Sequence, residues 1–209
     1  ALLATPYEAG LYAFATHYGS LIARLVLAPG EDACRLALAK CASDDRAARI
    51  GGLFAKGSLY VGLVCAAVGA PFGAAAARIL KGNAPENDIA ACGAALAFFC
   101  LQVPVLSLNG VCEACAHARA DARTLALLSG VHVACAVLFA LCARPALATT
   151  GPPGLVAAGG AVMALRALVA LYLARTRAFA KHGAAFAKAA APDAVALAVF
   201  VGAGAAARR

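Results

Sequence analysis

Charged residues are scarce in this 209-residue sequence, at 13% of the chain, and tryptophan is absent. Soluble domains usually carry about 25% charged residues, so this shortage argues against a soluble globular protein. The net charge is +8, but the basic residues are scattered between apolar blocks. Because no basic face is interleaved with aromatic residues, we expect no nucleic acid partner. The composition instead predicts a membrane protein whose loops carry the cations.

Patterns typical of metal sites and catalytic centres are also lacking. Among the nine cysteines, Cys112 and Cys115 form one C-x-x-C pair, with no second pair and no histidine pair at zinc spacing. We interpret these two as packing residues, the alternative being metal or redox chemistry. No nucleophile, acid–base dyad or phosphate-binding loop stands out. We therefore expect neither an enzyme nor a bound cofactor or metal.

Long apolar segments dominate what is present, since 64% of the residues are hydrophobic. A helix needs about 20 apolar residues to cross a hydrocarbon core about 30 Å thick. The segments that meet or approach this length lie near residues 10–28, 57–77, 89–111, 124–143 and 154–174, with a shorter sixth at 194–207. The predicted fold class is all-α, a polytopic transmembrane helical bundle forming a single domain over residues 1–209.

Proline and glycine residues divide and shape these segments. Pro29-Gly30 predicts a kink or break after the first span, followed by an amphipathic helix over Glu31–Cys41. Many spans are rich in alanine and glycine, so we expect close packing through small residues. The glycines expected to serve this purpose are Gly51, Gly52, Gly69, Gly73, Gly93, Gly159 and Gly160. The connecting segments on the side of the membrane where the first span ends contain more lysine and arginine residues than those on the opposite side. This difference predicts that the end of the first span faces the cytosol.

Arg24 is a charged residue within the first apolar segment, where charge is costly. Glu31 and Arg35 follow at offsets that return to nearly the same face of a helix. One interpretation is an arginine that extends its head to the membrane surface, beside a Glu31–Arg35 surface pair. The other is a cationic group that lines a water-filled cavity, with Glu31 tuning it.

Two further polar groups lie inside predicted spans. Gln102, Asn109 and Glu113 share one helical face, either as hydrogen-bonding residues between helices or as a stripe whose carboxylate pairs with Arg24 or binds a cation. Arg166 lies in the middle of the fifth span, too far from the surface to reach it easily. We expect Arg166 to be paired or to line a cavity.

Five segments of the sequence resemble the oligosaccharide-translocation (Rft) proteins of the endoplasmic reticulum. These segments are Gly10-Leu-Tyr-Ala-Phe, Tyr18-Gly-Ser-Leu-Ile-Ala-Arg24, Pro29-Gly-Glu-Asp32, Leu106-Ser-Leu-Asn-Gly-Val-Cys-Glu113 and Val162-Met-Ala-Leu-Arg166. They occur in the same order as in that family. Within the fourth motif, the family pattern is Leu-x-x-Asn-Gly-x-x-Glu.

The resemblance implies a place in the multidrug/oligosaccharidyl-lipid/polysaccharide exporter superfamily, whose members have two helical lobes around a cavity. The chain would be most of the second lobe of a longer protein, with the first lobe as its partner. The implied function is translocation of dolichol-diphosphate-linked oligosaccharide from the cytosolic to the lumenal leaflet of the endoplasmic reticulum membrane, or an accessory role in it, for N-glycosylation. Carried over by position, the implied cavity residues are Arg24, Glu31, Asn109, Glu113 and Arg166.

Two alternative functions stay open at this point. The first is a drug or metabolite exporter of the same superfamily, coupled to protons or sodium through Glu113 or Glu31. The second is a membrane scaffold or lipid chaperone of the glycosylation machinery that transports nothing itself.

Overall fold

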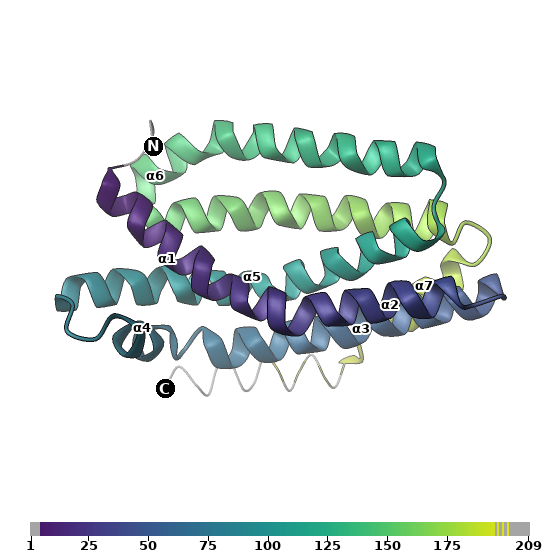
Figure 1. The fold of residues 1–209 in the computed structure, drawn as a ribbon, viewed down its shortest axis with the longest axis horizontal. Helices are drawn as coiled ribbons and strands as arrows, with labels where there is room; N and C mark the ends of the chain where they lie inside the picture. Colours follow the sequence, from purple (N-terminus) through teal and green to yellow (C-terminus); the bar gives the residue numbers. More distant parts are fainter. Residues whose placement is uncertain (1–4, 195, 197, 199, 201–209) are drawn as a thin grey trace.

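The computed structural model describes residues 5–194, 196, 198 and 200, and every regular element in them is helical. The elements in order are α1 (Pro6–Ile22), η1 (Ala23–Leu27), α2 (Ala28–Ala39), α3 (Asp44–Gly69), α4 (Gly73–Lys81), α5 (Glu86–Arg119), α6 (Ala122–Leu173), η2 (Ala174–Ala178) and α7 (Gly183–Ala190). The all-helical prediction is therefore confirmed for this part of the chain. Figure 1 shows an elongated bundle in which the long helices run roughly along one axis and α1 crosses them obliquely.

The first three elements form one continuous helix from Pro6 to Ala39. It starts at a capping box, in which the Thr5 hydroxyl accepts from the backbone N–H of Glu8 and the Glu8 carboxylate accepts from that of Thr5. Of the predicted kink or break at Pro29-Gly30, the structure has a change of direction between α1 and α2 without a break (Figure 1), at the π-helical segment η1, which ends two residues before Pro29. Proline has no N–H to donate to the carbonyl four positions earlier, so the preceding turn widens rather than ending the helix. The predicted amphipathic helix after it is confirmed as α2.

The predicted span 57–77 is wrong in its bounds. Helix α3 begins at Asp44, where the Ser43 side chain accepts from the backbone N–H of Arg46. Asp44 and Asp45 in its first turn favour the helix N-terminus, so polar residues expected in a loop are helical. The helix ends at Gly69 because Pro71 cannot continue it, and the short helix α4 follows.

The predicted spans 124–143 and 154–174 are both parts of α6, on either side of Gly151. Gly151 has φ 67° and ψ −157°, and Pro152 after it sterically disfavours helical geometry at that position. The two halves of α6 run antiparallel along one edge of the bundle (Figure 1). A Cβ on Gly159 in the second half would lie 3.6 Å from the Phe139 ring in the first. The glycine–proline step therefore folds a long helix into a hairpin.

Small residues let the helix backbones approach closely, as predicted. A Cβ on Gly62 of α3 would lie 2.5 Å from the Cα of Pro104 in α5, and one on Gly73 of α4 would lie 2.6 Å from the carbonyl oxygen of Gly93 in α5. Real Cβ contacts are never this short, so no larger residue fits these positions without moving a backbone. Gly159, at 3.6 Å from its nearest neighbour, makes only an ordinary contact.

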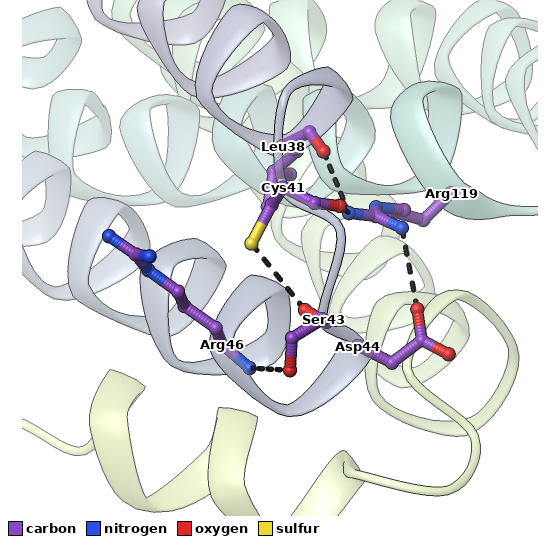
Figure 2. A network of polar contacts seen from close by, with 6 residues as sticks. All are labelled: Leu38, Cys41, Ser43, Asp44, Arg46 and Arg119. Carbon is purple, nitrogen blue, oxygen red and sulfur yellow. Dashed lines mark hydrogen bonds and ion pairs between the residues drawn. The ribbon is translucent and has the colours of Figure 1, made fainter.

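Arg119 at the end of α5 holds the connection between α2 and α3 (Figure 2). Its guanidinium donates to the carbonyl oxygens of Leu38, at 2.8 Å, and Cys41, and pairs with Asp44 Oδ1 at 3.3 Å. The last carbonyls of a helix lack intrahelical donors, and a cation there also complements the helix dipole. The Arg119 side chain therefore caps α2 from another helix.

The largest buried cluster lies where α2, α3, α5, α6 and α7 meet, and it is built mainly from alanine, cysteine and leucine. Large apolar side chains instead cover much of the outside, among them Leu25, Ile79 and Leu141, each at least 70% exposed. Among the described residues, four helices are long and apolar enough to cross a membrane: Pro6–Ala39, Asp44–Gly69, Glu86–Arg119 and Ala122–Ala178. An apolar exterior of this kind is what a lipid environment favours. The predicted sixth segment, 194–207, lies for the most part outside the described residues.

Candidate functional site

Glu113 of α5 is the centre of a polar cluster within the apolar helices. Arg166, in the second half of α6, donates from Nε to Glu113 Oε1 at 2.7 Å and from Nη2 to Oε2 at 3.0 Å. Both side chains are largely enclosed, since 13% of Glu113 and 28% of Arg166 is exposed. Two parallel N–H···O bonds are the strongest arrangement between these groups. The expectation that Arg166 is paired is therefore met, by a partner on another helix.

Two more side chains complete the coordination of this carboxylate. Asn109, one turn before Glu113 on α5, donates from Nδ2 to Oε1 at 2.7 Å. His132, in the first half of α6, places Nε2 at 3.1 Å from the same oxygen. The Oδ1 atom of Asn109 is buried and has no hydrogen-bond partner among the described residues. The cluster thus joins both halves of α6 to α5 through one carboxylate.

A pocket of about 220 Å³ opens beside this cluster. It is lined by side chains of both halves of α6 and by one residue of α1: Tyr12, His132, Cys135, Ala136, Phe139, Gly159, Val162, Met163 and Arg166. Arg166 and His132 belong both to the pocket wall and to the Glu113 cluster. A group entering the pocket therefore meets two of the three side chains that contact Glu113.

Arg24 and Glu31 do not join this cluster directly. Arg24 lies in η1, is exposed, and donates from Nη2 to Ser20 Oγ at 2.9 Å. Glu31 is half-buried against α5, where a Cβ on Gly110 would overlap its carboxylate. A π-helical turn contains more residues than an α-helical turn. For this reason, the α-helical spacing from Arg24 does not predict the face on which Glu31 lies.

The structure also gives the partners of Arg35, Glu113 and Gln102, for which the sequence predicted polar contacts. Arg35 pairs with Asp32, at 3.4 Å, and not with Glu31 as the surface-pair interpretation held. Glu113 pairs with Arg166 rather than Arg24. Gln102 donates from Nε2 to the carbonyl oxygen of Val156 at 2.6 Å, which is the interhelical hydrogen bond expected of it.

Sequence reasoning did not single out His132. Its signal was available, because His132 is the one histidine in the apolar segment 124–143, which contains no charged residue. An ionisable group inside a span is by default a functional candidate. The partner could not be read from the sequence, since Glu113 lies on a different helix.

The two cysteines of the C-x-x-C pair are fully buried in the main core. Cys115 Sγ lies 4.0 Å from the Sγ of Cys34 on α2, and all three thiols are free. In the described part of the chain, no group of three or more histidine, cysteine, aspartate or glutamate residues is arranged to hold a metal ion. The contacts of Cys112 and Cys115 are those of packed side chains.

The chemistry that this geometry supports is recognition and exchange of charged partners. An arginine offers a fixed fork of donors that fits a carboxylate or a phosphate equally well. A carboxylate bound by three side chains from two helices couples the positions of those helices.

The sequence matches the Rft protein family over residues 1–206. No curated protein and no solved structure is significantly similar to the chain. Because this match covers nearly the whole length of the chain, the chain belongs to the Rft protein family. That family is linked to the translocation of oligosaccharide-lipids.

Proposed function

We propose that this chain forms part of a membrane protein of the endoplasmic reticulum that translocates dolichol-diphosphate-linked oligosaccharide from the cytosolic to the lumenal leaflet for N-glycosylation. Its partners are then this lipid and a first helical lobe, which together with this one encloses a cavity. The step needs no covalent chemistry, so the chain acts as a transporter and not as an enzyme. Alternating access of two lobes moves the headgroup across the membrane.

The observation that carries the proposal is the Glu113–Arg166 pair with its Asn109 and His132 contacts. Arg166 lines the adjacent pocket while its guanidinium is held by Glu113. A diphosphate offers pairs of anionic oxygens that accept the arginine fork as a carboxylate does, so it competes for the same donors. Arg24, exposed on η1, supplies a second cation for the same headgroup. Exchange of Arg166 between carboxylate and phosphate would link substrate binding to the packing of α5 against α6.

The test replaces both arginines with glutamine in the full-length protein. In cells that rely on the Arg24→Gln/Arg166→Gln variant, we expect under-occupied N-glycosylation sites and lipid-linked oligosaccharide accumulating at the cytosolic leaflet. The matched control is Arg78→Gln, which removes an exposed arginine paired with Glu86. Membrane levels of all variants are measured in parallel. Normal glycan occupancy with the double variant present at normal level would refute the proposal.

One observation favours a second candidate, an exporter coupled to an ion gradient. His132 Nε2 lies 3.1 Å from Glu113 Oε1, which places two ionisable side chains in contact inside the apolar helices. Transport that depends on a proton or sodium gradient and is abolished by Glu113→Gln would favour this candidate. A phenotype confined to N-glycans, independent of ion gradients, would favour the lipid translocator.

Reconstitution separates the lipid translocator from a scaffold or lipid chaperone. Vesicles that contain the full-length protein and labelled lipid-linked oligosaccharide report movement of the headgroup between leaflets. A translocator accelerates this movement and a scaffold does not. The Arg166→Gln variant provides the internal comparison, because it removes the proposed recognition group and keeps the side chain polar.

A further inference from the structure

A second candidate binding site lies away from the Glu113 cluster, between α3, α5, the end of α6 and α7. It is an apolar groove of about 420 Å³. Its lining includes Leu59, Leu108, Leu168, Tyr172 and Phe186. It shares no residue with the pocket beside Arg166. A ligand of this groove is therefore independent of the proposed translocation site.

The groove opens on a surface where large apolar side chains are exposed. Leu168 is 65% exposed and Tyr172 is 64% exposed, although both lie on a helix that is long and apolar enough to span a membrane. Phe186 at the other wall is fully buried in the core. The groove thus leads from an exposed apolar surface into the protein, and an acyl chain of a bilayer lipid is an apolar group that suits such a surface on a candidate membrane span.

Among the described residues that line the groove, Arg175 is the one with a charged side chain. It lies in η2, directly after α6, and is exposed. Its guanidinium makes no hydrogen bond or ion pair with any residue that the structure describes. Asp193, the nearest acidic residue along the chain, is bound by Lys56 at 2.7 Å and by Tyr60 at 2.9 Å.

The sequence around the groove favours an anionic partner. Residues 122–192 and 194–209 contain no aspartate or glutamate. The segment that carries the groove instead contributes a run of cations: Arg175, Arg177, Lys181 and Lys188. A phosphate group at the membrane surface complements this charge, and basic pockets between membrane helices are suited to phospholipid headgroups.

We propose that the groove binds an anionic glycerophospholipid, with one acyl chain along its apolar walls and the headgroup phosphate on Arg175. The arginine fork engages two phosphate oxygens, while Lys188 on α7 adds charge nearby. Such a lipid fixes α7 against the end of α6. A zwitterionic lipid has a phosphate too, but its choline cation is repelled by the surrounding lysines and arginines.

The experiment measures binding of spin-labelled phosphatidylserine and phosphatidylcholine to the full-length protein in vesicles of phosphatidylcholine. Electron paramagnetic resonance gives the motionally restricted fraction of each labelled lipid. We expect restricted phosphatidylserine in excess of phosphatidylcholine, and about a tenfold loss of this preference in Arg175→Gln. Arg175→Lys should retain part of the preference because it keeps the charge.

Two matched pairs of variants identify the site. Arg144→Gln removes an exposed arginine outside the groove and should leave the preference unchanged. Ala187→Phe fills the groove and should reduce lipid binding, whereas Ala184→Phe, exposed on the same short helix, should not. Equal restriction of the two lipids by the unmodified protein overturns the proposal. A loss in Arg144→Gln as large as in Arg175→Gln, or no effect of Ala187→Phe in a folded protein, overturns it as well.

Discussion

The guanidinium of Arg166 reaches both carboxylate oxygens of Glu113, 53 positions earlier in the chain, and joins the second half of α6 to α5. Neither residue has a charged partner on its own helix. The bond is therefore a tertiary contact in the strict sense, and it places the cation beside a pocket that α1 also lines.

Removing one member of the pair should destabilise the protein more than removing both. Glu113→Gln or Arg166→Gln leaves an enclosed charge without its partner, at a cost of about 3 kcal/mol of unfolding free energy. The double variant should lose less than the sum of the single losses. Denaturation of the full chain in detergent micelles measures this double-mutant cycle.

The matched control for this cycle is the exposed Arg78–Glu86 pair, whose side chains are 64% and 70% accessible. Neutralising these residues should change stability by no more than about 0.5 kcal/mol. Strictly additive losses at Glu113 and Arg166 would contradict the coupling that we infer.

Arg119→Ala should loosen the connection between α2 and α3. The variant removes three contacts at once, to Leu38, Cys41 and Asp44, and takes the charged donor from the end of α2, where the Leu38 carbonyl keeps the backbone N–H of Cys41 at 3.2 Å. Hydrogen bonds to charged groups contribute about 1.5–3 kcal/mol, so the loss should be of this order. Hydrogen exchange should rise at residues 38–46. Arg46→Ala, which keeps the backbone contact to Ser43, serves as the control.

Two glycines of α3 should respond to alanine with opposite signs. Gly57 has no neighbour within 4 Å of a Cβ position, so Gly57→Ala should stabilise the helix by about 0.5–1 kcal/mol. A Cβ at Gly52 would lie 2.6 Å from the carbonyl oxygen of Phe186, so Gly52→Ala must displace α7. We expect a loss of about 1–3 kcal/mol. Thermal unfolding measures the change in melting temperature of each variant. Equal changes for the two variants would contradict the close approach of α3 and α7.

Asp121 should make stability depend on pH at the acidic end. The Thr124 hydroxyl and backbone N–H donate to its carboxylate and hold its pKa below the ordinary value of 3.8. The ionised form is thus favoured in the folded state, and its contribution is fully present above pH 3.8 and lost as the pH falls through the lower folded pKa. Asp121→Asn keeps the cap and lacks the charge. The melting temperatures of the two proteins should therefore converge only in acid, whereas a constant difference down to pH 2 would count against this assignment.

The buried thiols of Cys34 and Cys115 should be linked by oxidation, because their sulfur atoms lie 4.0 Å apart. In a full chain that retains only these two cysteines, diamide should form an intramolecular disulfide. After cleavage at a protease site inserted between α4 and α5, this disulfide should keep the two fragments joined on a non-reducing gel. Burial makes the reaction slow. A chain with only Cys34 and Cys100 should give no such product, and a cross-link in that control instead would refute the packing of α2 on α5.

The ends of the helices differ most from those that the hydropathy of the sequence predicts. Hydropathy located every long helix, because an apolar run of this length must satisfy its own backbone hydrogen bonds. It misplaced the ends of α3, since the helix starts where Ser43 caps it and not where the apolar residues start. Capping residues and Pro71 set the bounds, and hydropathy does not weight either of them.

For the candidate site, spacing along one helix was enough to place Asn109 beside Glu113, because residues four apart share a face. It failed for Arg24 and Glu31, where the π-helical segment η1 changes the number of residues per turn. It also gave no sign of His132 as a partner of Glu113.

The sequence by itself determined that the chain is helical and apolar, that glycine permits close helix packing, and that Arg166 is either paired or lines a cavity. These properties follow from local composition and from the cost of charge in an apolar surrounding. Only the tertiary structure decided that the partner is Glu113, that His132 shares it, and that an apolar groove ends at Arg175. Such contacts join residues on different helices, and they depend on which faces pack together after the chain has folded back at Gly151.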